Sequence, residues 1–221
     1  MSRIATITLV TLSALVLARP ASADSVTCSS TINGGTLPNV VVPAGQTCFI
    51  FNATINGNVL GEIDSKTFII TTTINGNVEG QDAEMVQLIN VIVNGNVGIV
   101  GGEVDDIAPF TFDYSICGTH VTGNVSITGS GGDAFVYTSP ASCGSRTTQI
   151  DGNLRIEGNS ARVRVIGIIV GRNAAIVNNT SATEKTIINN AIGKNLTCSG
   201  NTAPLTADSN TANKLIGQCG G

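Results

Sequence analysis

Ile55-Asn56-Gly57-Asn58-Val59 is the stretch of this sequence that decides the fold, because its pattern returns along the chain. The pattern is an apolar residue, any residue, Gly-Asn and a second apolar residue, and it recurs at residues 74–78, 93–97, 121–125 and 150–154. Copies with one residue inserted between the Gly and the Asn follow at residues 170–174 and 192–196. The asparagines are 19, 19, 28, 29, 20 and 22 residues apart. A period in this range predicts a solenoid of stacked repeats.

Alternation of apolar and polar residues around the repeat predicts β-strands. In residues 121–127 (VTGNVSI) an apolar side chain returns at nearly every second position, which is the period of a strand. Helical solenoids have longer units rich in Ala, Leu, Glu and Lys, and leucine-rich repeats need an L-x-x-L-x-L frame that this sequence lacks. We therefore expect an all-β fold, a single-stranded parallel β-helix of about eight short coils.

Inward side chains of such coils should stack into aliphatic ladders, because β-branched residues suit a half-buried pleated surface. Few aromatic residues and no Trp agree with a narrow interior. The repeat predicts the inward positions Ile55, Val59, Ile63, Ile74, Val78, Val93, Val97, Val121, Val125, Ile127, Ile150, Leu154, Ile156, Ile192 and Leu196.

The Gly-Asn step is typical of a bend between two strands, because Asn tolerates left-handed backbone geometry and its amide bonds local backbone groups. Coils in register would place the asparagines in one row of amides along an edge of the solenoid. The sequence predicts this turn ladder at Asn58, Asn77, Asn96, Asn124, Asn153, Asn173 and Asn195. Ligand binding by the row is the alternative, but the row coincides with the turn signal itself.

Six cysteines indicate a disulfide framework, because the pattern of residues 1–23, described below, predicts an exported chain. Residues one coil apart lie about 4.7–4.9 Å from each other, within the Cα separation that a disulfide tolerates. Separations of 20, 26 and 21 residues are each close to a local repeat length, so we expect three sequential bridges. These are Cys28–Cys48, Cys117–Cys143 and Cys198–Cys219. A zinc site is the competing interpretation, and it lacks a C-x-x-C pair.

Residues 1–23 have the pattern of a secretory signal peptide. Met1-Ser2-Arg3 carries one positive charge, an apolar run covers residues 4–17, and Ala21-Ser22-Ala23 supplies small residues for cleavage. The apolar run is too short to cross a bilayer comfortably. We therefore expect an exported β-helix domain over residues 24–221 that does not insert into a membrane.

Charge is unevenly distributed along this domain. Without the signal peptide, 9 basic residues face 15 acidic ones, a net charge of −6 that disfavours nucleic acid as a partner. Residues 24–113 hold ten acidic residues and one basic residue, whereas residues 114–221 hold eight basic and five acidic ones. In a rod built in sequence order this favours head-to-tail attraction between copies, although such unevenness also arises by chance on a solvated surface.

The asparagine spacings of 28 and 29 residues predict insertions, and therefore longer central coils, around residues 101–148. They hold one predicted disulfide, the acidic run at residues 103–106 (EVDD) and the aromatic residues Phe110, Phe112, Tyr114, Phe135 and Tyr137. Insertions in repeat proteins form loops on one face, which is often a binding face. A ligand site is therefore expected here if there is one, and a bulge pinned by a disulfide is the alternative.

Known catalytic motifs such as G-x-S-x-G and H-E-x-x-H are missing from the sequence. His120 directly precedes a predicted core strand, which favours a strand end over a general base. Asp82 with Glu84, or Asp105 with Asp106, would need further oxygens to bind calcium. We therefore predict no catalytic residue, no cofactor and no metal site. The run of threonines at 71–73 resembles an ice-binding row but does not recur at the repeat spacing.

Two end motifs accompany the repeat. Near the start, Cys28 is followed by Gly34-Gly35 and by residues 40–48 (VVVPAGQTC), and near the end stand residues 195–204 (NLTCSGNTAP) and 217–219 (GQC). In these features the chain resembles a group of small exported bacterial proteins built from Gly-Asn-Val repeats. That resemblance implies a right-handed parallel β-helix with no catalytic residues to carry over. The long central coils and the acidic first half depart from the group.

Together these features favour an exported structural or adhesive β-solenoid, secreted or at the cell surface, without enzymatic activity. Its expected partners are other copies of itself, head to tail, or an extracellular polysaccharide. The alternative is a polysaccharide-binding or polysaccharide-active β-helix protein that uses the insertions at 101–148.

Overall fold

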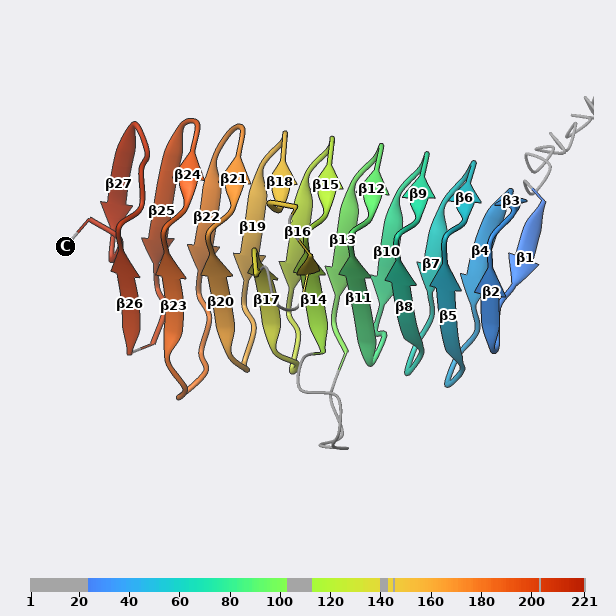
Figure 1. The fold of residues 1–221 in the computed structure, drawn as a ribbon. Helices are drawn as coiled ribbons and strands as arrows, with labels where there is room; N and C mark the ends of the chain where they lie inside the picture. The colour runs from blue at the N-terminus through green and yellow to red at the C-terminus, as the bar shows by residue number, and fades with distance from the viewer. Residues whose placement is uncertain (1–23, 103–112, 140–142, 145, 203, 221) are drawn as a thin grey trace, which may run out of the picture.

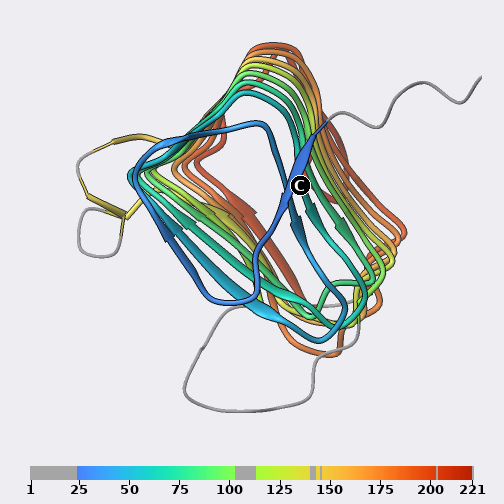
Figure 2. The same cartoon turned by 90° about the vertical axis from the view of Figure 1, so that its right-hand side faces the viewer.

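A computed structural model describes residues 24–102, 113–139, 143–144, 146–202 and 204–220. Within them the chain is a parallel β-solenoid with almost no helix, as the repeat predicts. Coils stack along one axis from the N- to the C-terminal end (Figure 1), and the view along that axis in Figure 2 shows a three-sided outline. In Figure 2 the chain runs clockwise as it recedes from the N-terminal coil, so the solenoid is right-handed. No helix of the described residues is long and apolar enough to cross a bilayer.

Each coil but the last contributes short strands to three parallel sheets, which the chain visits in the order B, C, A, and the last coil has no strand in sheet C. Sheet A contains β1 (Ser25–Thr27), β4 (Asn39–Val42), β7 (Val59–Gly61), β10 (Val78–Gln81), β13 (Val97–Val100), β16 (Val125–Thr128), β19 (Leu154–Glu157), β22 (Ala174–Val177), β25 (Asn195–Ser199) and β27 (Lys214–Gly217). Sheet B contains β2 (Thr31–Asn33), β5 (Thr47–Phe51), β8 (Lys66–Ile70), β11 (Met85–Ile89), β14 (Tyr114–Cys117), β17 (Ala134–Tyr137), β20 (Val163–Ile166), β23 (Lys185–Ile188) and β26 (Leu205–Asp208). Sheet C contains β3 (Thr36–Leu37), β6 (Thr54–Ile55), β9 (Thr73–Ile74), β12 (Ile92–Val93), β15 (His120–Val121), β18 (Gln149–Ile150), β21 (Ile169–Val170) and β24 (Ala191–Ile192).

The nine strands of sheet B correspond to nine coils, close to the number expected. The repeat motif does not mark the first and last coils. Pro38-Asn39 stands in the first coil where the next coil has Gly57-Asn58, and Asn213-Lys214 occupies the same place in the last coil. The predicted signal peptide and residues 103–112 lie outside the described residues.

Aliphatic side chains from all three sheets fill the interior as stacked rows. In sheet A, for example, Val59, Val78 and Val97 are paired in register and almost fully buried. The predicted inward positions are confirmed except for Ile63, which is 53% exposed. Ile63 lies beyond the end of β7, where the chain turns a corner through Asp64, so the two-residue period of the strand no longer applies.

Two of the three corners are turned by a residue with left-handed backbone geometry. Nearly every coil has one after sheet A and one after sheet B, and its identity varies among Gly, Asn, Asp, Ser and Thr. Because no single residue type occupies these positions in every coil, the sequence pattern did not reveal these corners. Those after sheet A are Gly45, Asp64, Asp82, Gly101, Gly129, Gly158, Asn178, Gly200 and Gly217. Those after sheet B are Gly34, Asn52, Thr71, Asn90, Gly118, Gly167, Asn189 and Ser209.

Candidate functional site

The predicted turn ladder is present at the third corner, between sheets C and A. The side-chain Oδ1 atom of each ladder asparagine except the last accepts the backbone N–H of the ladder asparagine in the next coil, at 2.7–3.3 Å. Sequence reasoning missed the first member, Asn39, because the residue before it is Pro38. The full ladder is Asn39, Asn58, Asn77, Asn96, Asn124, Asn153, Asn173 and Asn195.

The glycine of the repeat permits close packing between coils, which corrects the expectation of a left-handed bend. Neither the ladder asparagines nor the repeat glycines appear among the described residues with positive φ. A Cβ atom on Gly95 would lie 2.5 Å from the carbonyl oxygen of Gly76 in the preceding coil. Any side chain at this position would therefore push two coils apart.

A second row of asparagines runs parallel to the turn ladder on the outside of the solenoid. The Nδ2 group of Asn75 donates to Oδ1 of Asn56 at 3.2 Å, and that of Asn94 donates to Oδ1 of Asn75 at 2.9 Å. These side chains bond to their counterparts one coil away, as in the turn ladder. The recurrent asparagines thus connect coils, which supports the structural interpretation over ligand binding by the row.

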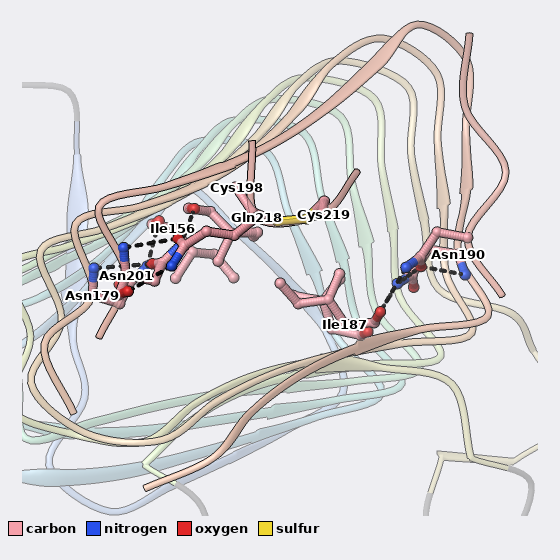
Figure 3. The surroundings of a disulfide bond; sticks show 11 residues. Ile156, Asn179, Ile187, Asn190, Cys198, Asn201, Gln218 and Cys219 are labelled. Carbon is pink, nitrogen blue, oxygen red and sulfur yellow. Dashed lines mark hydrogen bonds between the residues drawn. A yellow bond between two sulfur atoms is a disulfide. The ribbon is translucent and has the colours of Figure 1, made fainter. Parts of the chain in front are cut away.

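Buried amides form two further stacks inside the C-terminal half (Figure 3). The Nδ2 group of Asn179 donates to the carbonyl of Ile156 at 3.1 Å and to Oδ1 of Asn201 at 2.9 Å. At another corner, Nδ2 of Asn190 donates to the carbonyl of Val165 at 2.9 Å. Because these amides are buried, each needs these partners to offset the loss of water. The sequence pattern did not indicate these asparagines, since they lie outside the Gly-Asn motif.

All three predicted disulfides are present, with Cα separations of 5.6, 5.3 and 5.2 Å. Their geometry differs from the expected vertical stacking. Cys198 is paired in the sheet with Gly217, two residues before its bridge partner Cys219. The first bridge joins Cys28, directly after β1 of sheet A, to Cys48 in β5 of sheet B. Both terminal bridges therefore cross between unlike positions at the two ends of the solenoid.

The middle bridge holds a loop against the outside of the solenoid. Ile116 belongs to the core, so alternation along β14 places the neighbouring Cys117 on the outer face. The hydroxyl of Thr148 closes the loop by accepting the N–H of Gly118 at 2.8 Å and donating to the carbonyl of Tyr137 at 2.6 Å. The second insertion is thus a bulge pinned by a disulfide (Figure 2). The acidic run at 103–106, Phe110 and Phe112 lie outside the described residues.

His120 contacts a carboxylate on the outer face of sheet C. Its Nε2 atom lies 3.0 Å from Oδ2 of Asp151, and Gln149 donates to Oδ1 of the same carboxylate at 2.7 Å. The bond from Gln149, followed by that from His120, lowers the pKa of Asp151 below its usual value. These contacts link adjacent coils, and His120 is the first residue of β15. No hydroxyl or thiol among the described residues has a recorded hydrogen bond to the imidazole.

Asp82 and Glu84, the candidate calcium pair among the described residues, both have structural roles. Glu84 pairs with Lys66 at 2.9 Å, and Asp82 occupies a left-handed corner position. Within the described ranges no group of three His, Cys, Asp or Glu side chains is placed to hold a metal ion. Asp105 and Asp106 lie outside those ranges.

Lys185 is fully buried, a position that sequence reasoning did not anticipate. Its Nζ group donates to the carbonyl oxygens of Ser181 at 2.7 Å and Thr202 at 2.9 Å. Burial lowers the pKa of the ammonium group below its usual value. Since backbone carbonyls enclose the amine, its role is to satisfy polar groups at the corner between sheets A and B.

The outer face of sheet B carries most of the aromatic side chains. Phe49 stacks on Phe68 with ring centroids 4.7 Å apart, and the guanidinium groups of Arg162 and Arg164 lie 5.6 and 5.5 Å from the ring centroid of Phe135. Phe68 and Phe135 are only 4% and 2% exposed. Phe68 and Phe135 are therefore packed against neighbouring groups, whereas Phe49, Phe51 and Tyr137 are half-buried.

A hollow of about 260 Å³ lies on the outer face of sheet A, between β10 and β13. Two exposed polar side chains of β10, Glu79 and Gln81, border it, and Gly98 of β13 leaves the space beside Glu79 open. The lining residues are Asn77, Val78, Glu79, Gly80, Gln81, Asn96, Gly98 and Val100. Sequence reasoning missed this site, and the one signal for it is a glycine at an outward strand position.

Comparison with known proteins gives no relative: no protein-family model, curated protein or solved structure matches this chain.

Proposed function

We propose that the protein is an exported, non-enzymatic β-solenoid that provides a rigid structural or adhesive surface outside the cytoplasm. The observation that carries this proposal is that the recurrent polar side chains bond to neighbouring coils. The turn ladder and the outer asparagine row bond along the axis from coil to coil. Nine coils at a spacing of about 4.8 Å would give a rod about 43 Å long.

The disulfides support the extracytoplasmic part of the proposal. Three bridges indicate a chain that folds in an oxidising compartment, and the predicted signal peptide supplies a route to one. Bridges at both ends stabilise the coils that have a neighbour on one side only. A rod secured in this way suits an environment where proteases and dilution act on exposed proteins.

The terminal coils offer a route to self-association. The edge strands β1 and β27 each have a pairing partner on one side within sheet A. Leu215 occupies an inward position but is 43% exposed, because no further coil covers it. An acidic first half and a more basic second half add head-to-tail attraction. Sheet A has one strand more than sheet B, so a stacked copy would leave a gap in sheet B and the contact would be weak.

Adhesion and catalysis can be separated in one set of assays. Purified protein would be mixed with insoluble polysaccharides and examined for retention, while release of reducing sugar is followed with and without calcium. Light scattering at several salt concentrations would measure self-association in parallel. We expect retention on a surface or salt-sensitive association, with no sugar release. Release of sugar by the protein, or a monomer that no surface retains, would contradict the proposal.

A further inference from the structure

We propose that the hollow over Gly98 is a binding subsite for one unit of a neutral, hydroxyl-rich ligand, such as the pyranose ring of a polysaccharide. This goes beyond the proposed function, because a rod could adhere through any of its faces. The proposal assigns the contact to sheet A and names the residues that make it.

Gly98 is the first observation, because the fold does not require a glycine there. Its φ is not left-handed, and its strand continues in register with Glu79 on one side and Ser126 on the other, without a bulge. A Cβ atom at Gly98 would meet nothing within 4 Å. Glycine inside a strand weakens the strand and often marks close approach by a ligand or another backbone. No backbone of the described residues approaches this position, which favours a ligand.

Other strand glycines show the contrast. Gly61 and Gly80 face inward, where a Cβ atom would lie 3.0 Å from Oγ of Ser65 and 3.0 Å from Cγ2 of Val86, respectively. Gly217 has a left-handed φ of 69°. Each of these has a steric or conformational reason to be glycine. Gly98 differs from them, since it faces outward into open space.

Polar groups around the hollow match hydroxyls. Asn77, Glu79 and Gln81 alternate along one stretch of chain, so the Cα atoms of successive members are about 7 Å apart, and two neighbouring members can reach opposite edges of one sugar ring. The carboxylate only accepts hydrogen bonds, whereas the amides also donate them. A sugar hydroxyl does both and therefore suits this mixed set. Among the described contacts, the Nδ2 group of Asn77 has no recorded acceptor and Glu79 has no ion-pair partner.

Apolar surface completes the subsite. Val100 is 58% exposed, the largest exposure among the large apolar side chains described, and it lines the hollow beside Gly98. Together with the bare Cα of Gly98 it offers a patch for the C–H groups of a ring. A single carboxylate is too few for a metal ion, and the same negative charge disfavours acidic ligands. Neutral sugars therefore fit better than uronic acid polymers.

The decisive variant is Gly98→Thr, which fills the hollow. A β-branched residue at an outward strand position should keep or raise the stability of the protein. If the fold required a glycine at position 98, the same substitution would lower it. The matched control is Ala175→Thr, which adds a side chain of the same type at the equivalent outward position of β22. Binding would be measured by calorimetry and on arrays of neutral glucan, mannan and galactan oligosaccharides, with polygalacturonate as the acidic probe.

We expect the wild-type protein and the Ala175→Thr variant to bind at least one neutral oligosaccharide, and Gly98→Thr to bind it at least tenfold more weakly. If Gly98→Thr does not fold by circular dichroism, Glu79→Ala and Gln81→Ala should each weaken binding about tenfold. Absence of neutral ligands, preference for polygalacturonate, or unchanged affinity in the folded hollow variants would overturn the subsite. Retention on a polysaccharide surface that survives Gly98→Thr would leave the adhesive function in place and reject only this location.

Discussion

At the scale of single residues, two kinds of glycine separate fold from function. Repeat glycines such as Gly76 and Gly95 allow one coil to touch the next, because a Cβ on either would meet a backbone carbonyl at 2.6 or 2.5 Å. Gly98 is also a glycine, but a Cβ atom there would meet nothing within 4 Å. The sequence shows both as glycine in a strand-like context, so their different roles become visible only in the stacked coils.

Gly95→Ala should destabilise the protein by about 2–3 kcal/mol, because the added methyl overpacks rigid backbone that has little freedom to move. Gly98→Ala is the matched control and should be neutral or stabilising by up to about 1 kcal/mol. Urea unfolding followed by circular dichroism measures both. Equal stability of the two variants would show that the repeat glycine is not a packing requirement.

Tyr114 gives a prediction for alkaline pH. Its ring is fully buried, its hydroxyl donates to the carbonyl of Ala83 at 2.7 Å, and burial raises the pKa of its phenol to about 12. The unfolded chain has the ordinary pKa of 10.0, so the neutral phenol favours the folded state. That contribution is complete below pH 10 and is lost as the pH rises to about 12. The loss is about 3 kcal/mol.

Unfolding free energies of the wild type and Tyr114→Phe would be compared at about pH 9 and about pH 11.5. The wild type should be the more stable at the lower pH, and the difference should shrink or reverse at the higher one. Lys185, whose lowered pKa acts in the opposite direction, is common to both proteins and cancels in the comparison. A constant difference across this range would refute the assignment.

At the scale of elements, the corners explain how far the sequence could predict this fold. The corner between sheets C and A has a recurrent motif because a coil-to-coil contact demands glycine and a bonded asparagine there. The other two corners need only one left-handed residue, which several residue types supply, so they leave no fixed pattern. Alternation identified the inward rows but failed at Ile63, where the strand had already ended.

Disulfide pairing was predictable from the spacing of the cysteines, although vertical stacking of equivalent positions does not explain it. A separation near one coil brings two cysteines close together even when they do not occupy equivalent positions, as Cys198 and Cys219 show. The hollow over Gly98 was not predictable. Its signal is a missing side chain at one outward position, and outward positions are known only once the register of the strands is known.

The buried amide stacks give a stability prediction at the scale of elements. In Asn179→Leu the backbone N–H and Nδ2 groups of Asn159 lose their acceptor at 3.1 and 2.9 Å inside the core. We expect a loss of about 3 kcal/mol or more. Asn75→Ala, in the exposed outer row, is the control and should cost less than about 1 kcal/mol, because water replaces the lost partners. Thermal unfolding of both variants tests this, and similar costs would mean that burial does not strengthen the stacks.

At the scale of the whole molecule, stability is built from contacts between adjacent coils. Strands pair only with their counterparts one coil before and one coil after in all three sheets. In such a one-dimensional architecture the interface between neighbours is the unit of stability, and the number of coils is free to vary. Interior coils are therefore interchangeable in a way that elements of a globular core are not.

Removing residues 58–76 should therefore leave a folded solenoid that is one coil shorter. The deletion takes out β7, β8 and β9, one strand from each sheet, and joins Gly57 to Asn77, which restores the Gly-Asn step. At about 0.05–0.15 kcal/mol per residue, stability should fall by about 1–3 kcal/mol, and the denaturant dependence should decrease with the area buried. Removal of residues 58–67 is the control. It takes out β7 of sheet A and the first two residues of β8, leaves the rest of the coil out of register, and should unfold or aggregate. If both deletions unfold the protein, distant coils must depend on one another and the chain is not a modular rod.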